Sequence, residues 1–176
     1  MVNKIADMLI KYKAIEFGDF TLASGAKSPY YIDVKSAATN PEFLASLASE
    51  IAKTHDFDMV AGVAIGGVPL AVATGLVSKK PYAIIRASEK SHGKKNVVIG
   101  DVKGKLVLLV EDVTTSGGSA LYGVEALRGA GARCDRVVTV VDREEGAEKN
   151  LSTHGINLLP LVRIGELLKN HKKFLG

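Results

Sequence analysis

Residues 107–119 read VLLVEDVTTSGGS: an apolar run, two acids, and then hydroxyl-bearing residues mixed with glycines. Residues 106–110 are all apolar, which favours a short strand buried on both faces. Residues 119–130 place apolar side chains at helical spacing. The string therefore predicts a buried strand, a glycine-rich turn and a helix in succession, the repeating unit of an α/β fold.

The segments on either side of this string continue the alternation. We expect further strands at residues 59–65, 82–85, 97–99, 137–141 and 158–162, and helices at 69–77, 145–153 and 164–173. Another helix should begin after Asn40, which is a good N-cap, with Pro41 at its first position. Strands that alternate with helices favour a parallel sheet covered by helices on both faces.

The first 40 residues or so do not follow this pattern. Apolar residues at helical spacing predict a helix at 2–10, and two strands should follow at 17–22 and 30–34, with a turn at Ser24-Gly25 between them. We therefore expect a small N-terminal lobe attached to an α/β sheet. The length of 176 residues suits a single domain, so residues 1–176 are interpreted as one unit.

Composition and charge narrow the class of protein. The chain has one cysteine, Cys134, and its N-terminus lacks the pattern of a signal peptide, so we expect a soluble, cytoplasmic protein with no membrane span. The net charge of +4 fits either a mildly basic surface or a site for a polyanion. Because no run of five or more basic residues occurs, a small phosphorylated substrate is favoured over nucleic acid.

The polar half of the 107–119 string has the chemistry of a phosphate site. The start of a helix presents unpaired N–H groups and partial positive charge, and Gly117 and Gly118 let the backbone approach a ligand closely. Glu111 and Asp112 can accept hydrogen bonds from sugar hydroxyls or hold Mg²⁺. The alternative is a capped turn with solvated acids. Neither a Walker A loop nor a Rossmann fingerprint is present.

The string resembles the phosphoribosyl pyrophosphate (PRPP) signature of type I phosphoribosyltransferases. Three further segments are similar to the orotate phosphoribosyltransferases of that group. Residues 17–25 with 28–31 resemble their N-terminal hood, residues 86–93 resemble their mobile catalytic loop, and residues 141–146, VDREEG, resemble their orotate-recognition segment. The matches follow chain order and span most of the sequence.

The resemblance implies transfer of a phosphoribosyl group from PRPP to orotate, in the synthesis of UMP. Lys90, His92 and Asp112 would be catalytic, and orotate would bind Tyr31, Ile32, Thr115 and Arg143. Mg²⁺ would arrive with PRPP, with Glu111 and Asp112 as further candidate ligands. A homodimer is implied, with loop residues acting in the neighbouring site. PRPP would contact Ile65, Gly66, Arg86, Lys90, His92, Glu111, Asp112, Val113, Thr114, Thr115, Ser116, Gly117, Gly118 and Ser119.

This sequence departs from the resemblance at three positions. Many relatives of this kind have lysine where this chain has Ala23, Gly66 and Ala87, and Lys27 is a candidate to replace the charge missing at Ala23. A phosphoribosyltransferase for another nucleobase and a non-catalytic PRPP-sensing regulator therefore remain as alternatives. Arg143 has its own alternative, a surface ion pair with Glu144 or Glu145.

Overall fold

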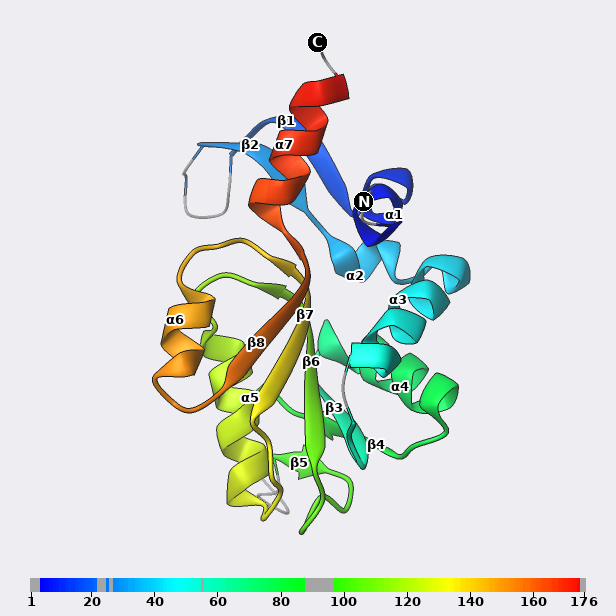
Figure 1. Cartoon of the computed structure of the whole chain (residues 1–176), viewed down its shortest axis with the longest axis vertical. Helices are drawn as coiled ribbons and strands as arrows, with labels where there is room; N and C mark the ends of the chain where they lie inside the picture. The colour runs from blue at the N-terminus through cyan, green and yellow to red at the C-terminus, as the bar shows by residue number, and fades with distance from the viewer. Residues whose placement is uncertain (1–3, 22–24, 26, 55, 88–96, 175–176) are drawn as a thin grey trace.

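A six-stranded sheet in the order β5-β4-β3-β6-β7-β8 forms the centre of the molecule (Figure 1). The computed structural model describes residues 4–21, 25, 27–54, 56–87 and 97–174. The sheet strands are β3 (Met59–Val63), β4 (Tyr82–Ile85), β5 (Val98–Ile99), β6 (Val107–Thr114), β7 (Arg136–Asp142) and β8 (Asn157–Arg163). The α/β fold predicted from the sequence is therefore confirmed.

The pairing is parallel except at one edge. β4 pairs β3, β3 pairs β6, and β6 to β8 pair in sequence, all in parallel, whereas β5 runs antiparallel to β4 with Ile99 opposite Ile84. The predicted parallel sheet therefore carries one antiparallel strand at its edge, an arrangement that is common in α/β sheets.

Helices cover both faces of the sheet. They are α1 (Lys4–Lys11), α2 (Val34–Ala37), α3 (Pro41–Thr54), α4 (Gly67–Ser78), α5 (Gly118–Gly129), α6 (Ala147–Ser152) and α7 (Ile164–Phe174). Figure 1 places α3 and α4 on one side of the sheet and α5 and α6 on the other. The side chains of β6 alternate accordingly: Leu108 and Val110 join one apolar cluster, and Val107 and Leu109 join the second.

Side-chain caps formed by Asn40 and Asp33 determine where two of the helices begin. The side chain of Asn40 accepts hydrogen bonds from the backbone N–H groups of Glu42 (3.0 Å) and Phe43 (3.2 Å), so the predicted cap of α3 is confirmed. The strand expected at 30–34 instead ends at Ile32, where Asp33 caps the short helix α2 through the N–H of Ser36 at 3.1 Å. The Asp33 carboxylate accepts hydrogen bonds from the side chain and the backbone of Ser36, and these bonds lower its pKa.

The N-terminal lobe is an antiparallel ribbon of β1 (Ile15–Thr21) and β2 (Lys27–Ile32) beside α1. Figure 1 places this ribbon at the end of the molecule where β6 and β7 finish. Ile5 and Leu9 of α1 are buried in the same apolar cluster as Phe43 of α3. The lobe is therefore packed onto the α/β sheet rather than held apart from it.

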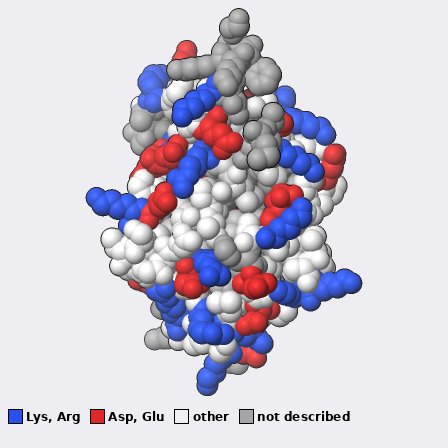
Figure 2. Space-filling view, viewed as in Figure 1, with Lys and Arg blue, Asp and Glu red and all other residues white. Residues whose placement is uncertain are grey.

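The single cysteine is buried, and the visible surface carries charges of both signs. The Cys134 side chain is buried, and loss of water around its thiolate raises its pKa to about 11. On the face seen in Figure 2, basic and acidic side chains are interspersed. Among the described residues, no helix has both the length and the apolar content needed to span a bilayer.

Candidate functional site

The acid pair lies inside β6 rather than beyond its end. β6 runs to Thr114, with Glu111 opposite Thr139 and Val113 opposite Val141 of β7. Glu111 is 4% exposed and Asp112 9% exposed, so the alternative of a capped turn with solvated acids is wrong. The strand continues past the acids because β7 still offers backbone partners there.

Burial changes the chemistry of Glu111. Its Oε1 atom accepts a hydrogen bond from Ser119 Oγ at 2.8 Å. Desolvation raises the pKa of the Glu111 carboxyl to about 7, the hydrogen bond from Ser119 opposes this shift, and the charge of Asp112 adds to it. Glu111 can therefore exchange a proton near neutral pH, in contact with the first turn of α5.

This raised pKa predicts a pH-dependent cost to folding. In the unfolded chain Glu111 ionises near its ordinary value of 4.5, but in the folded protein it ionises near 7, so stability is lost as pH rises through this range. Glu111→Gln removes the titration. Between about pH 5.5 and pH 8, the free energy of unfolding of the wild type should fall by about 2 kcal/mol more than that of the variant. Urea unfolding at both pH values measures this; parallel pH profiles would show that the carboxyl titrates normally.

The loop between β6 and α5 is fixed by hydrogen bonds to Asp142 and Asn150, and most of its own residues are exposed to solvent. Thr114 Oγ1 donates to the buried Asp142 carboxylate at 3.2 Å, and Asn150 Nδ2 donates to the carbonyl of Ser116 at 2.9 Å. Thr115, Ser116, Gly118 and Ser119 are exposed. Within the described part of the chain, no side-chain hydrogen bond caps the start of α5, so its N–H groups are available to an anion.

Position 117 of this loop requires a glycine. Its φ of +80° lies in the left-handed region, and a Cβ placed on it would lie 3.2 Å from Cα of Ala147. Ala147 belongs to α6, and its backbone N–H donates to the carbonyl of Thr115 at 3.1 Å. The glycine therefore lets α6 pack directly against the loop.

Asp112 meets a second loop at Gly66. A Cβ on Gly66 would collide with the carboxylate of Asp112, so the space that a side chain at position 66 would need is occupied by the acid itself. Ile65, the preceding residue, is 75% exposed, and the Ala64–Ile65 peptide bond is cis. The predicted PRPP contacts from β3 and β6 are therefore adjacent in space.

Lys35 also reaches the acid pair, although no motif or spacing in the sequence indicates this contact. Its Nζ lies 3.3 Å from Oδ2 of Asp112. The Lys35 side chain is 53% exposed and that of Asp112 13% exposed, so the ion pair lies at the mouth of the site. Lys27, the candidate to replace a charge at Ala23, instead donates to Thr21 Oγ1 at 2.8 Å within the hood.

Arg143 joins the site to the N-terminal lobe. Its backbone N–H donates to the carbonyl of Thr114 at 2.9 Å, which places it beside the phosphate loop. Its guanidinium lies 5.5 Å from the ring centroid of Tyr30 and pairs with Glu145 at 2.8 Å, the alternative foreseen for it. Its Nε atom is buried and has no hydrogen-bond partner among the residues that the structure describes. Of the predicted orotate contacts, Tyr31 is 46% exposed and stacks with Phe20 at 5.7 Å.

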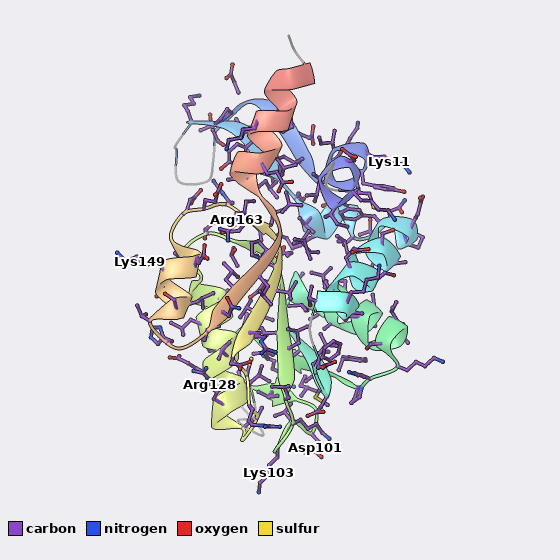
Figure 3. The ribbon with its side chains drawn as sticks, viewed as in Figure 1. Lys11, Asp101, Lys103, Arg128, Lys149 and Arg163 are labelled. Atoms are coloured by element: carbon purple, nitrogen blue, oxygen red, sulfur yellow. The ribbon has the colours of Figure 1, made fainter. Side chains whose placement is uncertain are left out.

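The segment that follows Arg143 is fixed by its own hydrogen bonds. Glu144 donates its N–H to Asp142 Oδ1 at 3.1 Å and accepts from the N–H of Gly165 at 2.7 Å. Arg163, labelled in Figure 3, pairs with both Asp142 (3.4 Å) and Glu148 (2.9 Å). These contacts tie the predicted orotate segment to β8 and α7.

The predicted catalytic loop is only partly described. Arg86 follows β4, and its N–H donates to the carbonyl of Val97 at 3.0 Å. Lys90 and His92 lie outside the described residues. No group of three or more metal-ligating side chains occurs among the residues that the structure does describe. Any ion held here would need oxygen atoms from a ligand in addition to those of the acid pair.

Comparisons with known proteins agree with this geometry. The phosphoribosyl transferase domain family matches residues 34–154. The orotate phosphoribosyltransferase of Methanocorpusculum labreanum is 65% identical over 168 residues, which are 96% of this chain and 99% of that protein. That of Methanoculleus marisnigri is 62% identical over 168 residues, with the same two coverages.

Solved structures give the same result. The crystal structure of orotate phosphoribosyltransferase from Aeropyrum pernix has a TM-score of 0.81 and 31% identity, over 96% of this chain and 98% of that one. The Mycobacterium tuberculosis enzyme in complex with PRPP has a TM-score of 0.77 and 26% identity, over 94% and 97% of the two chains. The chain therefore belongs to the phosphoribosyl transferase domain family and, within it, to the orotate phosphoribosyltransferases.

Proposed function

We propose that this chain transfers the 5-phosphoribosyl group of PRPP to orotate, giving orotidine 5′-monophosphate and pyrophosphate in the synthesis of UMP. One observation carries the proposal most directly. The Arg143 N–H bonds to the Thr114 carbonyl, so a segment that can bind a carboxylate adjoins a loop that can bind a phosphate. The near full-length relatives named above support orotate over another base and an enzyme over a regulator.

Each part of PRPP has a proposed place. The 5′-phosphate would bind the open loop and the start of α5, from Thr114 to Ser119. The ribose hydroxyls would donate to Glu111 and Asp112, and the pyrophosphate would bind the backbone at Ile65 and Gly66. Orotate would bind Arg143 and Thr115, with the backbone at Tyr31 and Ile32. Residues 1–176 would act as one domain, with about the first 40 forming the hood over this site.

The proposed reaction is a displacement at the anomeric carbon. N1 of orotate forms a bond to this carbon as the bond to the pyrophosphate oxygen breaks, with charge like that of an oxocarbenium ion between them, and the N1 proton leaves with the pyrophosphate. The chain's own groups hold both reactants in line. Lys90 and His92 would neutralise the charge that gathers on pyrophosphate, together with Arg86. A loop carrying these residues would also exclude water, which would otherwise hydrolyse PRPP.

We propose that Mg²⁺ is required, held by the oxygens of PRPP and by Glu111 or Asp112. When bound, the ion would offset the negative charge of the leaving pyrophosphate. Excess chelator should reduce turnover to near zero, and added Mg²⁺ should restore it. The melting temperature without substrate should not change, because the described residues provide no metal cluster of their own. Full turnover in chelator would rule the requirement out.

We propose that the functional unit is a homodimer, formed through α4 and the β4–β5 edge. α4 reads GVPLAVATGLVS and is apolar almost all round. Leu70 and Ala71 are buried against the sheet, but Leu76 is 75% exposed and Val77 47% exposed. Tyr82 of β4 and Ile99 of β5 add exposed apolar area on the same edge of the sheet. A helix with no polar face needs a second covering layer, and a second copy of the chain would provide it.

The decisive experiment combines the chain with PRPP, Mg²⁺ and one base at a time. Orotate absorbance should fall only when all components are present, and uracil, adenine and hypoxanthine should react far more slowly. Turnover of a purine at the rate of orotate would support the alternative base, and PRPP binding without any turnover would support a regulator. We place the enzyme in the cytoplasm, which suits a chain whose single cysteine is a buried thiol.

A further inference from the structure

We propose that Lys35 is a substrate-binding residue, whose ammonium group leaves the Asp112 carboxylate and binds the diphosphate of PRPP. This inference rests on the proposed function, because PRPP must occupy the site. It adds a cation that no local sequence motif indicated.

The position comes from three chain segments that meet at one carboxylate. Asp112 of β6 lies against Gly66 in the loop after β3, and Nζ of Lys35 in α2 lies 3.3 Å from the same carboxylate. The acid is the proposed ribose contact, and Gly66 is the proposed pyrophosphate contact. Lys35 therefore lies where the ribose and pyrophosphate parts of PRPP would join.

The negative charge of the acid pair would repel the diphosphate of PRPP unless a cation lay nearby. Glu111 and Asp112 are adjacent in β6 and mostly buried, so two carboxylates lie close together at this point. A diphosphate brought next to two carboxylates would be repelled unless a cation lay between them. Lys35 supplies such a cation, because its Nζ lies 3.3 Å from Oδ2 of Asp112.

The ion pair is weak enough to be exchanged. The Lys35 side chain is half exposed, and ion pairs of this kind contribute little to stability because water screens them. The backbone, in contrast, is fixed: Val34 and Ala37 on either side are buried, and Asp33 caps α2 through the N–H of Ser36. Only the side chain needs to move, over a distance that a lysine can cover by changing rotamers.

The test compares two ligands that differ in the diphosphate. Lys35→Met should weaken binding of PRPP, measured by calorimetry with Mg²⁺ present, by about 10-fold or more, the effect of losing one charged contact. Binding of ribose 5-phosphate, which lacks the diphosphate, should change by less than about 3-fold on the same reasoning. In turnover, KM for PRPP should rise far more than kcat falls. Lys35→Arg should restore most of the affinity, because it keeps the charge.

A double variant separates direct binding from support of Asp112. If Lys35 only neutralised Asp112, then Lys35→Met would have no effect in an Asp112→Asn background, and that result would overturn the proposal. Direct binding predicts that the loss of PRPP affinity persists there. Equal losses for PRPP and ribose 5-phosphate, or no loss for either, would also overturn it.

Two controls keep the outcomes distinct. Lys11→Met removes another exposed lysine that is paired with a carboxylate, Glu42 at 3.5 Å, but it lies on α1 away from the site and should leave PRPP affinity unchanged. Failure of the wild-type chain to bind PRPP would count against the proposed function itself. Normal wild-type binding with an unaffected Lys35→Met variant would count against Lys35 alone.

Discussion

Arg143→Ala should lower kcat/KM for orotate by roughly 30- to 1,000-fold, which corresponds to about 2–4 kcal/mol of lost binding in the transition state. The planar guanidinium can bind a carboxylate through two parallel hydrogen bonds, and its Nε is buried without a partner in the described structure. Uracil has no carboxylate, so the slow reaction with uracil should change much less. Steady-state kinetics with both bases would measure the difference.

Arg136→Ala is a matched control for this variant. Arg136 begins β7 and Arg143 follows its end, so the two arginines flank the same strand. Arg136 pairs only loosely with Asp135, at 3.9 Å, and lies at the end of the sheet opposite to the site. It should leave both activities near wild type. Equal losses for orotate and uracil in Arg143→Ala would show that Arg143 supports the fold of the loop and does not select the base.

Mixing two inactive variants should recover about a quarter of wild-type activity, given the two-fold symmetry of the proposed dimer. Lys90→Ala removes a residue proposed to act in the neighbouring site, and Asp112→Asn removes one that acts in its own. A mixed dimer then has one intact site and one site with both defects. Random exchange puts about half of the dimers in this form, and half of their sites are intact. Activity would be followed as subunits exchange.

The control for this experiment uses two defects in the same half of the site. Glu111→Gln and Asp112→Asn both lie in β6, so every site of their mixed dimer carries one defect and no activity should return. A mass-tagged chain would verify that exchange occurs. If exchange is complete and Lys90→Ala with Asp112→Asn recovers nothing, then the loop acts within its own subunit or the dimer is of another kind.

Most of the secondary structure follows from local patterns in the sequence. The buried strand at β6 and the cap at Asn40 are determined by residues close in the chain, and both predictions are confirmed. The strand predicted at residues 30–34 was wrong at its end, where α2 begins, and this error also has a local cause. Residues 30–34, YYIDV, have the composition of a strand, but Asp33 satisfies the N–H of Ser36 and turns the chain into a helix of four residues. Periodicity cannot reveal so short a helix.

The candidate site was predictable only where its residues are close in sequence. The string from Glu111 to Ser119 indicated a phosphate loop, and the structure keeps these residues together at the start of α5. The pairing of Lys35 with Asp112 joins residues 77 positions apart, and no periodicity or motif encodes such a contact. The burial that raises the pKa of Glu111 likewise depends on how neighbouring elements pack around β6.

The buried thiol of Cys134 has a practical consequence for labelling. It is the single cysteine of the chain, and with a pKa of about 11 it carries almost no reactive thiolate at neutral pH. A cysteine introduced at an exposed position such as Lys103, labelled in Figure 3, should therefore react with maleimide selectively. The natural sequence can serve directly as the background for attaching a single fluorophore or spin label, without first removing a native cysteine.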